Sequence, residues 1–524
     1  MHAPTTPIHP QPLLDALARS PDVPAFERGS RIVTRGELLE TASRIAVGMR
    51  AASLGPGSGI GIATAVSPEG VAVYLAAYAL GCRVVGLRTS GGSRQLAQML
   101  GTGLDAIVVD PSAQVLPEIA RAIPMLTIGG GQGGTDLLAS PARDEPLIAQ
   151  ARADDVARLV YTSGSTGAPK ACAQTYRALS THYLWQPDHW TNVIAELASR
   201  FGRYLLFGDL ASPVVFDYLG LCLLGGGTAV IPDPGQGALF PYAIERHRIT
   251  ASIMNVPRLY QMLDVLRDKP VDVGSLRAIM VSGSPLAPHR LEAALHRLGP
   301  VVYQGYGQNE HGMISLLTPE DIGQGHPSVL ASVGRPHPFV ELRVCAKDGE
   351  PVPAGTTGEI CVRSPYMMMG YWADPEESAA VLRDGWLHTR DLGYLDPQGF
   401  VHLVGRARDI ILVNAEICHA GAIERLLAAH PDVDQAYVVG TPDDKTGEAI
   451  HAFIVPAAGT VPNASVLSAI VRAELGEASV PKSIRIVDGV PIAPSGKPDK
   501  RALLPSLSSE SSDPSSDKRS SGER

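Results

Sequence analysis

The chain has 524 residues, of which 45% are hydrophobic and 19% charged, and its formal net charge is -9 at pH 7. This length exceeds what one ordinary core can organise, so we expect two or more domains. The acidic balance argues against a general nucleic-acid-binding protein, which normally carries a basic surface. The six cysteines are scattered without a CxxC pair, so their spacing indicates neither a zinc site nor a disulfide framework.

Composition and apolar runs also predict the cellular compartment and whether the chain enters a membrane. The N-terminus lacks the charged-then-apolar pattern of a signal peptide, and no apolar run is long enough to span a bilayer. Scattered unpaired cysteines fit a reducing environment. We therefore expect a cytoplasmic protein without membrane insertion.

The first 400 residues alternate helical and strand-like segments. Residues 1–12 are rich in proline and are expected to be frayed. Apolar spacing then predicts a helix over 37–52, a strand over 60–63, a helix over 70–80 and a strand over 83–85. The rhythm returns with predicted strands at 171–175, 229–231, 252–254 and 278–281, and predicted helices from 176 and at 241–247, 258–266 and 291–298. Strand–helix–strand order favours parallel pairing, so we expect a large α/β domain of subdomains with mixed sheets over residues 1–404.

Near Gly405 the character of the chain changes. Helices are predicted at 420–429 and 464–475, and strands at 436–439, 449–455 and 484–487. We expect a short connector over 405–409 followed by a small, mobile α+β domain over 410–505. Residues 506–524 contain nine serines and almost nothing apolar, so a disordered tail is predicted.

A loop rich in glycine and hydroxyl groups follows an apolar strand at 159–162. It consists of Thr162, Ser163, Gly164, Ser165, Thr166, Gly167, Ala168, Pro169 and Lys170. Glycines let backbone N–H groups point inward, and hydroxyls and a lysine add donors, so the loop suits phosphate oxygens. It is neither a Walker A motif nor a dinucleotide fingerprint. A flexible surface loop is the alternative, and the flanking segments predict a strand–loop–strand turn.

The sequence of this loop resembles the phosphate loop of the adenylate-forming superfamily. That superfamily includes acyl- and aryl-CoA synthetases, adenylation domains of nonribosomal peptide synthetases and firefly luciferase. Five further segments resemble the family's motifs in the same order: YQGYGQNEHG at 303–312, GEICVRSPYMMMGY at 358–371, GWLHTRDLGYLD at 385–396, GRARD at 405–409 and PSGK at 494–497. The ordered matches extend over nearly the whole chain, so we identify it by resemblance as a member of this superfamily.

The resemblance implies an ATP site and assigns roles within it. Residues 162–170 would hold the β- and γ-phosphates, with Thr166 taking part in catalysis, and Glu310 would hold Mg²⁺. Tyr306 would stack on adenine. The remaining predicted nucleotide-binding residues are Ser282, Gly283, Ser284, Pro285, Gly305, Gly307 and Asn309.

The resemblance also implies that the C-terminal part completes the reaction. Asp391 would accept hydrogen bonds from the ribose hydroxyls, and Arg406 would contact the ribose or the α-phosphate. Lys497 would stabilise charge on the α-phosphate during adenylation. Arg408 matches the hinge about which the family's C-terminal domain rotates between two half-reactions.

The chain departs from the family pattern at several places. Ala171, Asn309 and Arg390 replace a glycine, a threonine and a glycine of the motifs. Beyond the connector, Asn414 and Ala415 replace a Gly–Gly pair, and Ala420 replaces a proline. In thioester-forming relatives this hairpin lines the channel for the pantetheine arm, so the resemblance supports adenylation without assigning the thiol acceptor.

The acid-binding pocket is predicted near residues 207–218. The aspartate that binds an α-amino group in amino-acid-activating relatives falls near Ser212 or Pro213 here, while Phe216–Asp217 comes too late, so an α-amino acid is disfavoured. An apolar acyl or aryl group with one polar substituent fits better. The candidate pocket residues are Phe207, Asp209, Ser212, Phe216, Tyr303, His311 and Met313.

The leading hypothesis is an ATP- and Mg²⁺-dependent acid–thiol ligase that makes an acyl-adenylate and then an acyl-CoA. One alternative passes the acyl group to the phosphopantetheine of an acyl or peptidyl carrier protein. Another is a catalytically silent nucleotide-binding relative. Neither a nucleic acid nor a membrane is an expected partner.

Overall fold

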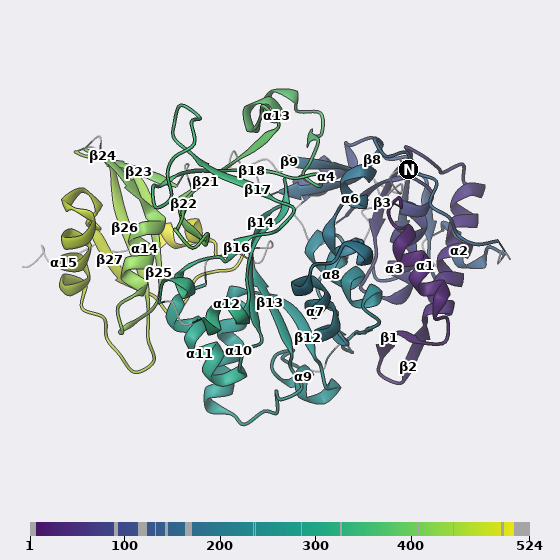
Figure 1. The fold of residues 1–524 in the computed structure, drawn as a ribbon, viewed down its shortest axis with the longest axis horizontal. Coiled ribbons are helices and arrows are strands. Elements are labelled where there is room, and N and C mark those ends of the chain that lie inside the picture. Colours follow the sequence, from purple (N-terminus) through teal and green to yellow (C-terminus); the bar gives the residue numbers. More distant parts are fainter. Residues whose placement is uncertain are drawn as a thin grey trace, which may run out of the picture. The chain divides into compact units, whose positions relative to one another are not determined.

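The structure is a computed structural model. It describes residues 7–87, 93–113, 123–130, 133–141, 145–162, 170–233, 235, 237–284, 286–324, 327–406, 409–414, 416–443, 445–493 and 497–507. The chain divides into two compact units (Figure 1). The first comprises 1–389 and 394–402, and the second 390–393 and 403–524. Within the described residues, no helix has both the length and the apolar character needed to cross a membrane.

The first unit contains an eight-stranded mixed sheet. Its strands, in spatial order, are β19 (Gly370–Tyr371), β9 (Lys170–Thr175), β8 (Val156–Thr162), β4 (Arg83–Gly86), β3 (Gly59–Ala63), β5 (Ala106–Val109), β6 (Met125–Thr127) and β7 (Thr135–Asp136). Helix α3 (Pro68–Ala79) joins β3 to β4, which pair in parallel, so the predicted strand–helix–strand unit is confirmed. Ser67 caps this helix by accepting the Gly70 N–H, and nearly every residue of α3 is buried.

A nine-stranded sheet forms the other large part of this unit. Its order is β16 (Arg335–Pro336), β15 (Gly312–Leu317), β14 (Val302–Gln308), β13 (Ala278–Ser282), β12 (Ala251–Asn255), β10 (Arg203–Leu205), β11 (Thr228–Val230), β1 (Pro24–Arg28) and β2 (Arg31–Thr34). β12, β13 and β14 run parallel, because helices return the chain between them. The connecting helices in this part are α8 (Pro213–Leu224), α9 (Tyr242–His247), α10 (Val256–Asp268) and α11 (Pro288–Leu298).

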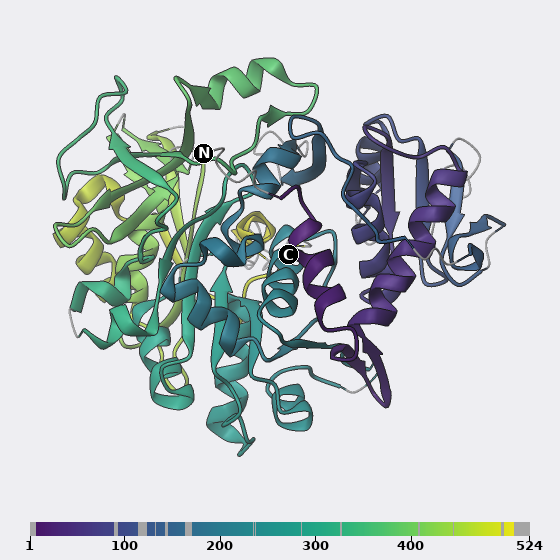
Figure 2. The ribbon, with the colours of Figure 1, turned by 45° about the vertical axis from the view of Figure 1, so that its right-hand side comes forward.

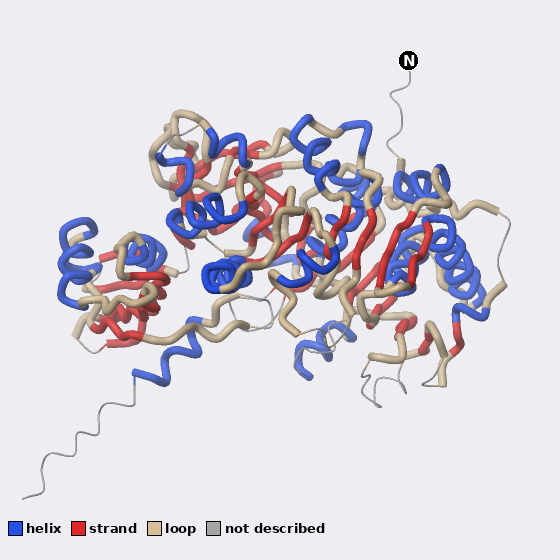
Figure 3. The backbone as a smooth tube through the Cα atoms, turned by 90° about the horizontal axis from the view of Figure 1, so that it is seen from below, coloured by secondary structure: helices blue, strands red, loops and turns tan. Residues whose placement is uncertain are grey.

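The tube drawing colours the helices blue and the strands red (Figure 3), and the described residues of this unit contain seven further helices. They are α1 (Gln11–Arg19), α2 (Arg35–Ala51), α4 (Ser93–Leu100), α6 (Tyr176–Ser180), α7 (Asn192–Arg200), α12 (Pro319–Gly323) and α13 (Pro375–Val381). Short 3-10 turns occur at Leu137–Ala139, Tyr183–Trp185, Pro187–His189 and Pro327–Ala331.

The prediction of a frayed segment over 1–12 is wrong for its described end. Helix α1 already begins at Gln11 and packs beside α2 (Figure 2). His9 is only 2% exposed, and its N–H donates to Ser180 Oγ at 2.9 Å. Proline at the start of a helix is compatible with folding because the first N–H groups need no intrahelical acceptor.

A third sheet consists of β17 (Glu341–Cys345), β18 (Gly358–Arg363), β21 (Trp386–Leu395) and β20 (Leu382–Arg383), with β22 (Val401–Arg406) paired to β21. The division between the two units runs through β21 and β22. This sheet therefore carries the chain from one unit into the other.

The second unit has the small α+β fold that the sequence predicts. Its sheet is ordered β24 (Glu416–His419), β23 (Ile410–Val413), β26 (Gly447–Pro456) and β25 (Val433–Asp443), with β27 (Ser483–Ile486) paired to β26. Its helices are α14 (Ala420–Ala428) and α15 (Ala464–Leu475), with 3-10 turns at Glu477–Ser479 and Lys500–Leu507. The last of these includes Ser506 and Leu507, so the predicted disordered tail starts too early, and 508–524 lie outside the described residues.

Candidate active site

The predicted phosphate loop is flanked by two strands. β8 and β9 pair antiparallel, and Thr162 stands opposite Lys170 where the loop leaves the sheet. The predicted strand–loop–strand arrangement is therefore correct at both ends of the loop. Ser163, Gly164, Ser165, Thr166 and Gly167 lie outside the described residues, so their roles stay predictions.

Glu310 lies just after β14, half-buried, and faces a neighbour from another strand. The Tyr371 hydroxyl donates to Glu310 Oε1 at 2.9 Å, and the Glu310 carbonyl accepts the Met368 N–H at 2.8 Å. Tyr371 reaches this place because β19 pairs with β9, with Tyr371 opposite Cys172. The pairing thus brings the motif at 358–371 beside the strand that follows the phosphate loop.

Lys170 is the positive charge of this region. Its ammonium lies 2.6 Å from Glu377 Oε1 and 5.4 Å from the centre of the Tyr371 ring. Both members of the ion pair are largely buried, with side-chain exposures of 16% and 22%. Asn309 completes the connection to β8, since its Nδ2 donates to the Tyr161 carbonyl at 3.4 Å. Glu310, Tyr371, Lys170 and Glu377 therefore form one polar group where the two large sheets approach.

The carboxyl ends of three parallel strands supply the next predicted residues. Asn255 at the end of β12 stands opposite Ser282 on β13, and Ser282 stands opposite Gly305 on β14. Gly283 follows with a φ of +96°, a conformation that favours glycine. Ligands of α/β proteins commonly bind at this edge of a parallel sheet. The structure thus brings Ser282, Gly283 and Gly305 together; Ser284 follows them directly, and Pro285 lies outside the described residues.

Gly305 and Gly307 have a steric reason to be glycine. A Cβ on Gly305 would lie 2.6 Å from Met313 Sδ, and one on Gly307 would lie 2.3 Å from the Gly312 carbonyl oxygen. Both clashes arise from the close pairing of β14 with β15. Tyr306, between them, is 7% exposed. Its predicted role against adenine is not tested by the geometry.

The predicted acid-pocket residues occupy several environments. Asp209 accepts the Ala211 N–H at 2.8 Å just before α8, and Ser212 stands at the N-cap position of that helix without a side-chain capping hydrogen bond. Phe207 packs against Phe240 and under the Arg258 guanidinium, while buried Tyr303 lies near Arg200. Burial raises the pKa of Tyr303 to about 12. The other members, Phe216, His311 and Met313, lie on α8, after β14 and on β15.

Phe216 belongs to an aromatic core. Its ring stacks on Trp185 at 5.7 Å and lies 5.2 Å from Tyr74. The cavity beside it, which Arg158 also lines, measures about 20 Å³ and is large enough for a water molecule. A larger hollow of about 310 Å³ is lined by β2, α2 and the start of α3, and it includes none of the predicted site residues.

The neighbouring Asp217 is committed to the protein interior. Its carboxylate lies 3.3 Å from the Arg158 guanidinium and accepts the Trp185 indole N–H at 3.1 Å. Burial by itself would raise the pKa of Asp217, but the adjacent guanidinium outweighs it and lowers the pKa. A carboxylate paired in this way has little capacity left for a substrate ammonium group. This agrees with the expectation that an α-amino acid is disfavoured.

His311 lies among buried rings. The centre of its ring lies 5.3 Å from that of Tyr366, and the Tyr366 ring lies 5.2 Å from the His182 ring. The His337 and Tyr183 ring centres are 3.9 Å apart. Burial lowers the pKa of His182 to about 4 and of His311 and His337 to about 3. These imidazoles are therefore neutral at neutral pH and belong to a buried aromatic cluster.

The second unit contains the predicted ribose-binding and adenylation residues. Arg406 Nε donates to Asp391 Oδ1 at 3.0 Å, and Asp391 is 5% exposed. Lys497 is exposed, and its backbone carbonyl accepts the Ala493 N–H at 2.8 Å. Nearby, Lys500 pairs with Glu424 of α14, which also accepts the Val438 N–H. Arg408 lies outside the described residues.

Two departures from the family pattern share a backbone feature. Arg390 has a φ of +58° and Asn414 a φ of +52°. Both stand where the family has glycine, and a positive φ is the physical reason for glycine at such places. Asparagine tolerates this conformation better than most residues. The hairpin of β23 and β24 thus presents a side chain at a position with positive φ, residue 414; Ala415 lies outside the described residues.

Two members of the polar group carry no assignment from sequence alone. Tyr371 belongs to a motif, but only its pairing beside β9 places its hydroxyl on Glu310. Glu377 lies in the first turn of α13, where an acidic residue is common, so no sequence signal distinguishes it. The strand register is what assembles this part of the site.

Known proteins are similar to the chain in both sequence and fold. The family described as AMP-binding enzyme matches residues 13–372, and the AMP-binding enzyme C-terminal domain matches residues 422–497. A medium/long-chain-fatty-acid–CoA ligase, FadD8, of Mycobacterium tuberculosis is 31% identical over 94% of this chain and 88% of its own. A feruloyl-CoA synthase of an Amycolatopsis species is 32% identical over 91% and 94%.

A solved structure supports the same conclusion. The amide bond synthetase McbA from Marinactinospora thermotolerans superposes with a TM-score of 0.83 at 32% identity, covering 94% of this chain and 99% of that one. The chain therefore belongs to the AMP-binding enzyme family, the adenylate-forming enzymes that its motifs resemble. The predicted fold and the predicted class, an adenylate-forming acid–thiol ligase acting on a small carboxylic acid with ATP, are confirmed.

Proposed function

We propose that the chain activates an apolar carboxylic acid, aryl or fatty, with ATP and Mg²⁺ and transfers the acyl group to CoA. The observation that carries this proposal is the half-buried Glu310, held by Tyr371 next to the strands of the phosphate loop. A carboxylate oxygen is the ligand type that Mg²⁺ prefers. Glu310 would hold Mg²⁺, and the ion would supply positive charge against the phosphates.

In the first half-reaction, a carboxylate oxygen of the acid attacks the α-phosphorus of ATP. The bond to the bridging oxygen breaks, pyrophosphate leaves, and an acyl-adenylate remains. Both reactants are anions, so the protein must supply donors and positive charge at the α-phosphate. We assign that role to Lys497, with Thr162, Thr166 and Asn309 as donors to the phosphates. Asp391 takes the ribose hydroxyls and Arg406 orients Asp391, to which it is hydrogen-bonded.

The acid specificity rests on what surrounds the candidate pocket. Phe207, Met313 and the neutral His311 offer apolar and weakly polar contacts, and the buried Asp217 is paired with Arg158. Such a lining favours an uncharged tail over one carrying an ammonium group. Fatty-acid and feruloyl ligases among the relatives support an acid of this type.

In the second half-reaction, the thiol sulfur of CoA attacks the acyl carbon. The thioester forms, AMP leaves, and the thiol proton passes to solvent. A carrier-protein phosphopantetheine would react by the same chemistry. Rotation about Arg408 would replace Lys497 by another face of the second unit between the two steps.

A second candidate acceptor is an amine. The similarity to an amide bond synthetase and the side chain of Asn414, where relatives have glycine, support it. An amine nitrogen would attack the acyl carbon of the same adenylate, giving an amide, AMP and a proton. The adenylation step is common to both candidates.

The test is a pyrophosphate-exchange screen over fatty, aryl and amino acids, followed by addition of CoA, a carrier protein or an amine, with product mass as the readout. We expect exchange with aryl or fatty acids and a CoA thioester. Lys497→Ala should abolish exchange while ATP binding persists, and Lys445→Ala, at an exposed lysine of the same unit, is the control. Full exchange by Lys497→Ala contradicts the assigned role. If no acid supports exchange, the chain is a silent nucleotide-binding relative.

A further inference from the structure

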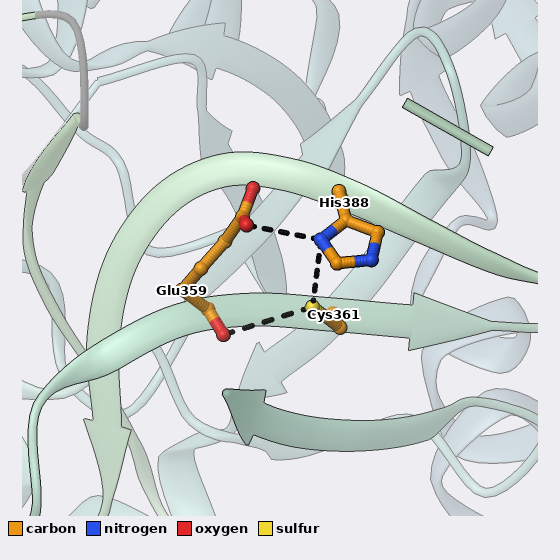
Figure 4. Close-up of side chains that lie close together, drawn as sticks. All are labelled: Glu359, Cys361 and His388. Carbon is orange, nitrogen blue, oxygen red and sulfur yellow. Dashed lines mark hydrogen bonds and ion pairs between the residues drawn. The ribbon is translucent and has the colours of Figure 1, made fainter. Parts of the chain in front are cut away.

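Three side chains converge on the third sheet, away from Glu310 and the strand ends. His388 Nδ1 lies 3.0 Å from Glu359 Oε2 and 3.5 Å from Cys361 Sγ (Figure 4). These three donor atoms all lie within 4.8 Å of one another. Cys361 is 0% exposed and His388 8%, whereas Glu359 is partly open to solvent. The adenylation chemistry uses none of them.

The sheet register explains the convergence and adds a fourth donor. On β17 and β18, Cys345 stands opposite Glu359 and Arg343 opposite Cys361. Opposite residues, and residues two apart on a strand, share a face of a sheet, so Cys345, Glu359 and Cys361 lie on one face. His388 joins them from β21, the next strand. Burial and the neighbouring Cys345 thiol both raise the pKa of Cys361.

A nucleophilic triad does not account for this arrangement. In such a triad the histidine uses one ring nitrogen for the nucleophile and the other for the carboxylate. Here Glu359 and Cys361 both approach Nδ1. Cys361 is also fully buried, and its pKa is raised, so it is shielded from substrates and poorly ionised without a partner.

The two distances from His388 Nδ1 instead approach the edges of a tetrahedral metal site. Zinc binds nitrogen and oxygen at about 2.0–2.2 Å and sulfur at about 2.3 Å, which at the tetrahedral angle separates donors by roughly 3.3–3.7 Å. The observed 3.0 and 3.5 Å are close to those values. We propose that Glu359, Cys361 and His388, with Cys345 as the fourth ligand, form a binding site for one zinc ion.

Charge and access both suit this ion. Two thiolates and one carboxylate around Zn²⁺ leave a single negative charge. Arg343, on the same face, is positioned to offset it, since its guanidinium lies 4.2 Å from the Trp386 ring, two residues before His388. An ion can enter past Glu359, whose side chain is 26% exposed. On binding, the two thiols release their protons to solvent.

The consequence is a cross-link between three strands. The ion joins β17, β18 and β21 through Cys345, Cys361 and His388. β21 continues from His388 to Asp391, the predicted ribose ligand, within three residues. Zinc is thus a structural element that fixes the start of the strand carrying this residue.

The test uses the full chain, stripped of metal with a chelator under reducing conditions. Cobalt titration should give a thiolate-to-cobalt charge-transfer band that saturates at one ion per chain, and zinc should abolish the band. Absence of that band at one equivalent overturns the proposal. A disulfide between Cys345 and Cys361 in the reduced preparation, found by peptide mapping, overturns it as well.

Matched variants locate the site. Cys361→Ala should weaken zinc binding by more than the roughly 10–100-fold typical of losing an outer-shell partner. Cys222→Ala, at another fully buried cysteine whose Sγ faces the Phe201 carbonyl, should leave binding unchanged. If Cys361→Ala does not fold, Glu359→Gln serves, because its side chain is partly exposed. It should retain the thiolate band and lose affinity more than about tenfold; unchanged affinity contradicts the site.

Discussion

Two glutamates of the first unit illustrate how surroundings give the same side chain different chemistry. The Glu310 carboxylate accepts a tyrosine hydroxyl near a lysine, at the end of a strand. The Glu359 carboxylate lies on a sheet face beside an imidazole and two thiols. Oxygen donors suit a hard, hydrated ion such as Mg²⁺, whereas nitrogen and sulfur donors suit zinc. The difference arises from which strands are neighbours, not from the glutamate.

Each glutamate also has a histidine next to it, with opposite consequences. His311 follows Glu310 in the chain, but its ring is buried against Tyr366, and burial lowers its pKa to about 3. His388 comes from a different strand, and its Nδ1 faces Glu359 directly. Proximity in sequence therefore does not decide which histidine serves a carboxylate.

Exchanging the two glutamates for glutamine tests the comparison most strongly. Glu310→Gln should lower pyrophosphate exchange by about 10²–10³-fold, because a neutral amide cannot replace the metal-binding carboxylate. Glu359→Gln should mainly weaken zinc binding, and under the same magnesium concentration it should lower exchange far less, because zinc acts on the reaction only through the strand that carries Asp391. Equal losses of exchange in both variants would remove the distinction between the sites.

The buried histidine predicts a pH effect on stability. The folded pKa of His311 lies near 3, below its ordinary 6.5, so the unfolded chain binds more protons in that interval and stability falls as pH drops. Between pH 7 and pH 5 this histidine should cost about 2 kcal/mol. In denaturant titrations, His311→Phe should reduce the loss by that amount, whereas exposed His296→Phe should not. An unchanged pH slope contradicts a neutral, buried His311.

Removing the Tyr371 hydroxyl that donates to Glu310 should have a smaller effect on pyrophosphate exchange. Tyr371→Phe removes a hydrogen bond to a carboxylate, worth about 1–2 kcal/mol, so half-activation should need roughly tenfold more Mg²⁺. The measurement is exchange rate against magnesium concentration. Tyr242→Phe, on α9, is the control. If Tyr371→Phe behaves like the control, the hydroxyl does not orient Glu310.

A substitution at a position with positive φ, outside the Glu310 and Glu359 sites, tests backbone strain alone. At Asn414, with φ +52°, valine should destabilise the second unit by about 1–2 kcal/mol, because branched side chains disfavour the left-handed region. Glycine should be tolerated, as in relatives. Thermal unfolding monitors both variants, and equal stability of the valine and glycine variants would argue against the positive φ. Neither variant should alter zinc binding.

The sequence by itself determined the family, the order of the motifs and most helices and strands. Periodicity identifies α3, α10 and α15 because each has a recognisable apolar pattern or cap. Ser282, Gly305 and Glu310 are predicted site residues because they lie in short segments that resemble family motifs, and the structure places them on or just after β13 and β14. Helix α1 was missed, since proline at its start resembles a frayed segment.

Only the tertiary structure decided which residues meet. Tyr371 reaches Glu310 through the pairing of β19 with β9, and His388 reaches Cys361 through neighbouring strands 27 residues apart. Spacing along the chain indicates no zinc motif, because a sheet places ligands side by side through register instead of through a fixed local interval. Positive φ values at Arg390 and Asn414 likewise appear only in the folded backbone. Short sequence motifs determine the class of enzyme, whereas strand pairing determines which side chains contact one another.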